Sequence, residues 1–181
     1  MHKESKQGTG LIIKRTFSYL DKAIITQLYK VFVRPHLEYN QQIWSPSLQQ
    51  DIEELEQVQH RATKLIPSLE HLTYEERLKE LNLYSLKDRR IRGDLILMYR
   101  IMSGDIKIDH NDLFEMAKDN RTRGHNLKVH INKVCKTSIR QNFFTERVAE
   151  PWNALPSYIV NSTNVDQFKH NYDKWSGIVV G

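Results

Sequence analysis

Apolar residues recur at helical spacing along most of the chain, and this pattern predicts a mainly α-helical protein. The first predicted helix covers residues 22–33 and begins at Asp21, which can act as its N-cap. The apolar residues on one side of it are Ile24, Leu28, Val31 and Phe32. Pro35 either ends this helix or opens the next one at its first position, and that second helix would reach Trp44.

The longest amphipathic segment opens at Ser45-Pro46 or Ser47 and ends at Pro67. Its apolar residues step by three and four along the chain: Ile52, Leu55, Val58, Ala62, Leu65 and Ile66. This spacing places them on one face, as in a helix that packs on a core.

Capping signals mark two further helices. Thr73 and Glu76 have the spacing of a capping box and predict a short helix through Leu81. Ser85 with Asp88 opens a longer one, which Gly104 would end. Its apolar residues are Leu86, Ile91, Leu95, Met98, Tyr99 and Met102.

The pattern changes after Asn120. Leu127, Val129 and Ile131 alternate with polar residues, so we expect a short extended or β segment near 126–135. Helices are expected at 112–117, 143–152 and 165–175. The predicted fold is a helical module ending near Pro67, packed on a second helical module without a Gly/Ser linker between them.

The 181 residues carry a net charge of +5, from 27 Lys and Arg against 22 Asp and Glu. Acidic residues dominate the range 47–80, whereas 121–147 is basic apart from Glu146. This surplus favours a nucleic-acid partner, either RNA or DNA. The single cysteine permits no internal disulfide, and no signal peptide or membrane-spanning stretch is visible. We therefore expect an intracellular protein, nuclear or cytoplasmic, with no membrane partner.

Enzyme signatures are absent from the sequence. It has no Gly-rich phosphate loop, no His-Glu-x-x-His and no Gly-x-Ser-x-Gly. Two-metal polymerases need paired carboxylates to hold magnesium, and no two aspartates are adjacent here. We expect no catalytic activity and no cofactor.

A zinc site is the functional interpretation of His125, His130 and Cys135. Their spacing fits no established zinc finger, and strand geometry would send them to opposite faces. Surface histidines with a buried thiol are therefore the favoured alternative.

Two groups of cations could contact phosphates. Lys87, Arg89, Arg90 and Arg92 lie on a helix whose other face is apolar, which suits a helix lying along a nucleic-acid backbone. The alternative is a solvated face with local pairs such as Asp88–Arg92. Arg121, Arg123 and Lys128 form a basic arm that could follow a sugar–phosphate backbone, or a simple basic loop.

Large aromatic residues could stack on bases, as they do in single-strand binding proteins. They are Trp44, Phe143, Phe144, Trp152 and Trp175. Burial in the core is the favoured interpretation, because they lie within helical apolar patterns.

Four blocks in the chain carry a family pattern. They are Leu28 to Tyr39 with Trp44-Ser45-Pro46; Asp51-Ile52 with Leu55 to Gln59 and Arg61-Ala62; Tyr74 to Leu78 with Leu81, Leu83, Leu86, Arg89-Arg90 and Tyr99; and Phe143-Phe144 with Arg147, Trp152-Asn153 and Leu155-Pro156. In this order they resemble the region after the palm in jockey-like and related non-LTR retrotransposon reverse transcriptases.

The resemblance implies a non-catalytic fragment of an RNA-directed DNA polymerase. Residues 1–67 would be a helical thumb that grips the template–primer duplex. Residues 68–175 would be a C-terminal region with a basic arm at 121–140, followed by a tail at 176–181. The palm with its Asp-Asp motif is not found in this sequence.

The implied contacts in the thumb are Arg34, Arg61 and Lys64, which add to the cations of the helix and the arm. Arg34 could instead pair with Glu38. An alternative function is a protein-interaction module, in which the acidic 47–80 region and the tryptophans dock on the palm or another protein. A third alternative is a remnant with no selected function.

Overall fold

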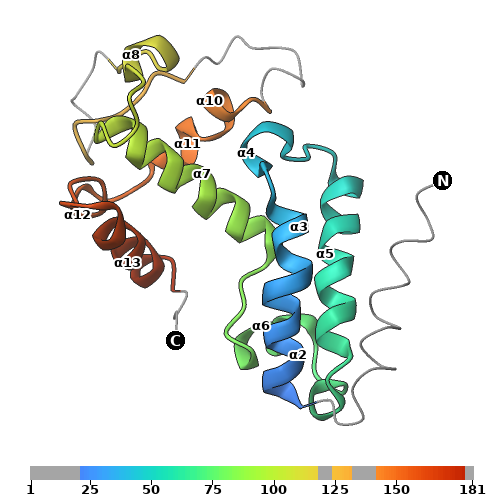
Figure 1. Cartoon of the computed structure of the whole chain (residues 1–181). Coiled ribbons are helices and arrows are strands. Elements are labelled where there is room, and N and C mark those ends of the chain that lie inside the picture. Colours follow the sequence, from blue (N-terminus) through green and yellow to red (C-terminus); the bar gives the residue numbers. More distant parts are fainter. Residues whose placement is uncertain (1–20, 118–123, 132–141, 178–181) are drawn as a thin grey trace. The chain divides into compact units, whose positions relative to one another are not determined.

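The computed structural model describes residues 21–117, 124–131 and 142–177, and these are mainly helical, as the sequence predicts (Figure 1). They fall into two compact units. Among the described residues, the first unit comprises 21–41 and 46–88, and the second comprises 42–45, 89–117, 124–131 and 142–177. None of the described helices is both long and apolar enough to cross a membrane.

The first unit contains a set of short helices around one long helix. Its elements are α2 (Lys22–Leu28), the π-helix η1 (Tyr29–Val33), α3 (Arg34–Glu38), α5 (Gln49–Lys64), the 3-10 helix η2 (Pro67–Leu69) and α6 (Tyr74–Glu80). The small apolar core consists of Ile25 of α2, Leu69 of η2, and Ile66 and Leu81, which follow α5 and α6.

Helix α2 begins as predicted, because the Asp21 carboxylate accepts from the Lys22 amide at 2.8 Å. The buried positions are Ile25 and Tyr29. Ile24 and Phe32, on the side that the apolar spacing marked, remain exposed. The apolar stripe with Ile25 and Tyr29 is thus buried in the first unit, whereas the neighbouring stripe with Ile24 and Phe32 is exposed.

The region around Pro35 differs from the two predicted helices. The Arg34 amide bonds to the Tyr29 carbonyl, five residues back, so the chain passes into α3 through a wide turn. Such a turn suits a proline, whose ring crowds a helix and which has no N–H to donate. The expected continuation to Trp44 is wrong, because Asn40 adopts a left-handed φ of 51° and α4 (Gln41–Trp44) starts afresh.

Helix α5 ends before Pro67, as predicted, but neither expected start, Ser45-Pro46 or Ser47, provides its N-cap. Leu48 is the N-cap and gives no side-chain hydrogen bond. The most buried residues of α5 are Gln59 and Thr63, while its apolar residues Ile52, Leu55, Val58 and Ala62 are half-buried.

The other helix-start signals are confirmed. Thr73 and Glu76 form the capping box of α6. The Ser85 hydroxyl accepts from the Asp88 amide at 3.0 Å at the start of α7 (Leu86–Met102). Gly104 follows that helix with a φ of 79°.

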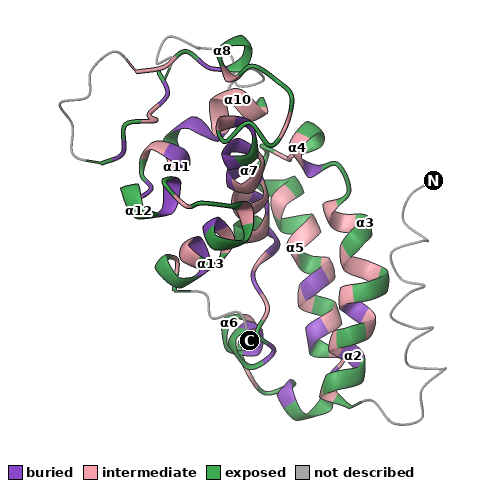
Figure 2. Ribbon diagram, turned by 60° about the vertical axis from the view of Figure 1, so that its left-hand side comes forward, coloured by how far each residue is buried: buried purple, intermediate pink, exposed green. Residues whose placement is uncertain are grey.

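The second unit has the larger core. Its elements are α4, most of α7, α8 (His110–Leu113), α10 (Phe144–Arg147), α11 (Ala149–Asn153), α12 (Ser157–Val160) and α13 (Val165–Trp175). Figure 2 shows buried residues gathered on α7, α11 and α13. Trp152 and Phe168 are 0% exposed, and the Phe168 ring stacks on Tyr99 at 4.5 Å.

The helix predicted at 165–175 is confirmed, and 143–152 forms two short helices, α10 and α11. The helix expected at 112–117 instead occupies His110–Leu113, because Asp109 caps it through the Asn111 amide. The predicted extended segment near 126–135 is described only over 126–131, where Val129 forms an isolated antiparallel bridge with Met116 and no strand is formed.

The unit boundary follows Asp88, whereas the sequence partition lies near Pro67. Residues 68–88 belong with the first unit because Tyr74, Arg77 and Leu81 pack or hydrogen-bond onto α5 and the core that it shares.

Candidate nucleic-acid interface

A buried hydrogen-bond network centred on Gln59 orients α5. The Tyr29 hydroxyl donates to Gln59 Oε1 at 2.5 Å, and Gln59 Nε2 donates to the Tyr84 carbonyl at 2.8 Å and to the Tyr74 hydroxyl at 3.0 Å. Gln59 is 0% exposed, so these bonds fix which face of α5 points inward.

Glu56, one turn before Gln59, places the start of α7 against α5. Both of its carboxylate oxygens accept from the Leu86 amide, at 3.2 and 3.1 Å. A carboxylate at a helix N-terminus is favourable, because the amides there carry partial positive charge. The Tyr74 hydroxyl also donates to Glu56, and burial followed by this hydrogen bond raises the pKa of Tyr74.

The opposite face of α5 carries the first candidate contacts. Arg61 and Lys64 are exposed and lie three residues apart, which makes them neighbours on the helix surface. Neither has an ion-pair partner within residues 21–117, 124–131 and 142–177. We call these two residues the α5 basic end.

His60, the residue before Arg61, is affected both by burial and by the charges around it. Its pKa is lowered, first by burial and then by the nearby charges of Arg77 and Lys64, with a smaller effect of Arg61. Glu75 acts in the opposite direction but does not reverse the shift. After burial, the charges around His60 thus favour its neutral ring, because Arg77 and Lys64 together outweigh Glu75.

Arg77 also contributes positive charge near His60, although the sequence did not predict this role. It is buried, and its Nε donates to Thr63 Oγ1 at 3.2 Å while Nη1 donates to the Leu72 carbonyl at 2.5 Å. Its Nη2 is buried and has no hydrogen-bond partner among the described residues. The spacing of Arg77 from Tyr74, three residues, and from Leu81, four, could have indicated a position on the inner face of α6.

The α7 cations do not form one accessible row. Lys87 is exposed and belongs to the first unit, whereas Arg89 is half-buried. Arg90 is only 6% exposed. Arg92 makes a two-point ion pair with Asp173 of α13, at 2.6 and 2.8 Å. The prediction that Arg90 and Arg92 face a ligand conflicts with this placement. Arg90 is buried, and the guanidinium of Arg92 is already bound to the Asp173 carboxylate.

The remaining predicted contacts are dispersed. Arg34 on α3 is half-buried. Lys128 is half-buried in the segment 124–131 of the second unit. Arg121 and Arg123 lie outside the described residues.

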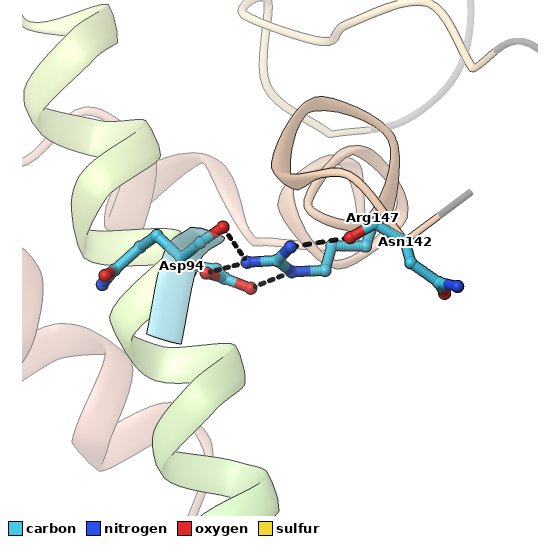
Figure 3. Close-up of polar contacts among 4 residues, drawn as sticks. Asp94, Asn142 and Arg147 are labelled. Carbon is cyan, nitrogen blue, oxygen red and sulfur yellow. Dashed lines mark hydrogen bonds and ion pairs between the residues drawn. The ribbon is translucent and has the colours of Figure 1, made fainter. Parts of the chain in front are cut away.

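Arg147, from the last block of the resemblance, ties three parts of the second unit together (Figure 3). Its Nε and Nη2 donate to the two Asp94 carboxylate oxygens at 2.8 and 3.0 Å. Its nitrogens also reach the carbonyls of Asn142 and Gln42, at 2.7 and 2.9 Å. Burial raises the pKa of Asp94, and Arg147 partly opposes that shift. This arginine is structural rather than available to a ligand.

The two histidines of the zinc hypothesis, His125 and His130, differ in burial. His125 is buried and its Nε2 donates to the Trp152 carbonyl at 3.0 Å, whereas His130 is exposed. Cys135 lies outside the described residues. In the described part of the chain, no three His, Cys, Asp or Glu side chains are grouped to hold a metal ion.

The aromatic residues divide between core and surface. Trp152 is in the core, as expected, but Trp44, Phe143 and Trp175 are exposed. Phe144 is half-buried and packs edge-on against Phe114, with ring centres 6.2 Å apart.

Comparisons with known proteins give no further identification: no family model, no curated protein and no solved structure matches this chain.

Proposed function

We propose that this chain binds nucleic acid without catalysing a reaction, as the thumb and C-terminal part of a non-LTR retrotransposon RNA-directed DNA polymerase. The observation that carries the proposal is the α5 basic end, where Arg61 and Lys64 are exposed and have no carboxylate partner among the described residues. Lys87 adds a third exposed cation in the same unit. The four blocks of sequence resemblance suggest the polymerase origin.

Such a surface would recognise the phosphate backbone and not the bases. Lysine and arginine that approach phosphates release condensed counterions, so the affinity falls as salt rises. Because the backbone is the same for every sequence, binding is expected to be sequence-independent. Template–primer duplex, with RNA or DNA as template, is the proposed partner.

The test measures binding to duplex DNA and to an RNA–DNA hybrid by fluorescence anisotropy over a range of salt concentrations. Arg61→Ala and Lys64→Ala are each expected to reduce the log–log salt slope on duplex DNA by about 0.9. Arg100→Ala is the matched control, since Arg100 is also an exposed cation in the last turn of a helix. It should leave the slope unchanged.

An affinity that stays constant from low to moderate salt would contradict a phosphate-binding mechanism. Equal effects of Arg61→Ala and Arg100→Ala would show that net charge matters and the α5 basic end does not. A primer-extension assay with the purified chain is expected to give no product, and extension would overturn the non-catalytic part of the proposal.

A second candidate function is docking on another protein, such as the palm of a related polymerase. Phe32 is 63% exposed, and it lies four and eight residues from Leu28 and Ile24 on an apolar stripe beside the buried one. A stable complex with a separately purified palm, weakened by Phe32→Ser and unaffected by Arg61→Ala, would favour this function.

A further inference from the structure

We infer that Trp152 and Asn153 are positioning residues that hold Lys128 as a fixed cation for a nucleic-acid backbone. This inference rests on the proposed function and extends it to the second unit. Neither residue would contact the ligand, and both would act through the segment 124–131.

Asn153 provides a side-chain substitute for a neighbouring strand. Its Nδ2 donates to the Val129 carbonyl at 2.8 Å, and its Oδ1 accepts from the Val129 amide at 2.9 Å. The side-chain amide thus satisfies both backbone groups of one residue, which is how a strand neighbour would hold it. Val129 is the residue directly after Lys128.

Trp152 holds the residue on the other side of Lys128. Its indole Nε1 donates to the Leu127 carbonyl at 2.7 Å, and its own carbonyl accepts from His125 Nε2 at 3.0 Å. The ring itself is fully buried in the core. The position of Leu127 is therefore set by a side chain that is fully buried in the core of the second unit.

The opposite edge of the segment is held by the chain at 115–117. The Ala117 amide donates to the Lys128 carbonyl at 2.9 Å, and the His130 amide donates to the Glu115 carbonyl at 2.6 Å. Lys128 therefore lies in backbone that is bonded along both edges.

The Lys128 side chain has a defined place as well. A Cβ built on Gly124 would lie 3.0 Å from Lys128 Cε and 3.1 Å from Nζ, so the ammonium group lies over Gly124. Gly124 has a φ of +135°, which L side chains rarely adopt. The Lys128 charge also contributes to lowering the pKa of His125, after burial, which supports its proximity.

A lysine on a free loop loses conformational entropy when it binds a phosphate, and fixing its backbone beforehand removes part of that cost. Asn153 is thus expected to influence binding only through Lys128. The consequence is a non-additive effect of the two residues, which a purely structural role for Asn153 does not produce.

The experiment is a double-mutant cycle on the full chain, with the dissociation constant for duplex DNA at low salt as the readout. Lys128→Ala is expected to weaken binding and to lower the salt slope by about 0.9. Asn153→Ala is expected to weaken binding in the wild-type background and to have no further effect in the Lys128→Ala background. Additive effects, or an unchanged affinity in Asn153→Ala, would overturn the inference.

Gly124→Ala is a second variant that leaves Asn153 intact. Its new methyl group displaces the Lys128 ammonium, so the slope should fall while the Val129 amide stays protected from hydrogen exchange. If Asn153→Ala does not fold, Gly124→Ala still tests whether the placement of Lys128 matters for binding. An unchanged salt slope in Gly124→Ala would contradict the inference.

The outcomes separate this inference from the proposed function. If the wild-type chain shows no salt-dependent binding, the proposed function fails and the inference with it. If the wild type binds and Arg61→Ala lowers the slope, but Lys128→Ala does not, only the positioning inference fails.

Discussion

Gln59 shows how one polar residue can organise the first unit. It lies on the buried face of α5 and has its side-chain oxygen and nitrogen bonded to three separate groups, from Tyr29, Tyr74 and Tyr84. A satisfied buried amide is tolerated in a core, whereas its loss leaves the former partners without hydrogen bonds. The network is thus more sensitive to substitution than the half-buried apolar residues beside it.

Gln59→Leu is expected to destabilise the first unit by roughly 1–3 kcal/mol for each buried group left without a partner. The measurement is denaturant unfolding of the variant against wild type. Gln57→Leu is the matched control, because Gln57 is exposed on the same helix and should change stability little. Similar midpoints for the two variants would contradict the importance of the network.

His125 makes the stability of the second unit depend on pH. Burial lowers its pKa below the usual value of 6.5, so the folded state favours the neutral ring. As the pH falls below about 6.5, His125 binds a proton in the unfolded chain but remains neutral in the folded chain. The contribution of His125 is therefore complete above that pH and is lost between it and the lower pKa of the folded state.

His125→Gln should reduce this loss of stability on acidification, because glutamine can still donate to the Trp152 carbonyl but does not titrate. Thermal unfolding at about pH 7.5 and about pH 5.5 would measure the difference. His170→Gln, at an exposed position of the same unit, should retain the wild-type pH dependence. A variant His125→Gln that loses stability as the wild type does would exclude His125 as the cause.

At the level of elements, helix ends were predictable and helix faces less so. The caps at Asp21, Thr73 and Ser85 are formed as the sequence predicts, because each depends on residues one to three positions away. The buried face of α2, in contrast, was not predictable from its apolar residues. Ile24 and Ile25 are equally apolar, and packing against the rest of the first unit decides which of the two is covered.

The link from α10 to α7 through Arg147 and Asp94 carries an element-scale prediction. Arg147→Ala leaves the Asp94 carboxylate buried without its cation, which should cost about 3–5 kcal/mol of second-unit stability. Hydrogen exchange would follow each unit separately, and the first unit should be unaffected.

Lys169→Ala is the control for that variant. It removes a lysine from the exposed pair Lys169–Asp166, and such a pair contributes less than about 1 kcal/mol. If both variants had equally small effects, the Arg147 contacts would be incidental to the stability of the second unit.

On the scale of the whole molecule, the last block of the resemblance has a structural explanation. Arg147 binds Asp94, Trp152 and Leu155 lie in the core, and Asn153 holds Val129. These residues build the second unit and its arm rather than presenting a ligand surface. The candidate surface instead consists of exposed cations that form no ion pair with another described residue, namely Arg61, Lys64 and Lys87.

The sequence was sufficient for the helical class, most helix ends and the set of cations, since each follows from residues within about one or two turns of one another. It could not tell which cations are open to a ligand. Arg92 is closed by Asp173, 81 residues away, and Arg147 reaches Asp94 across 53 residues. Pairs so distant in the chain meet only when the folded backbone brings them together, and burial then decides whether a charge serves the fold or remains available to a partner.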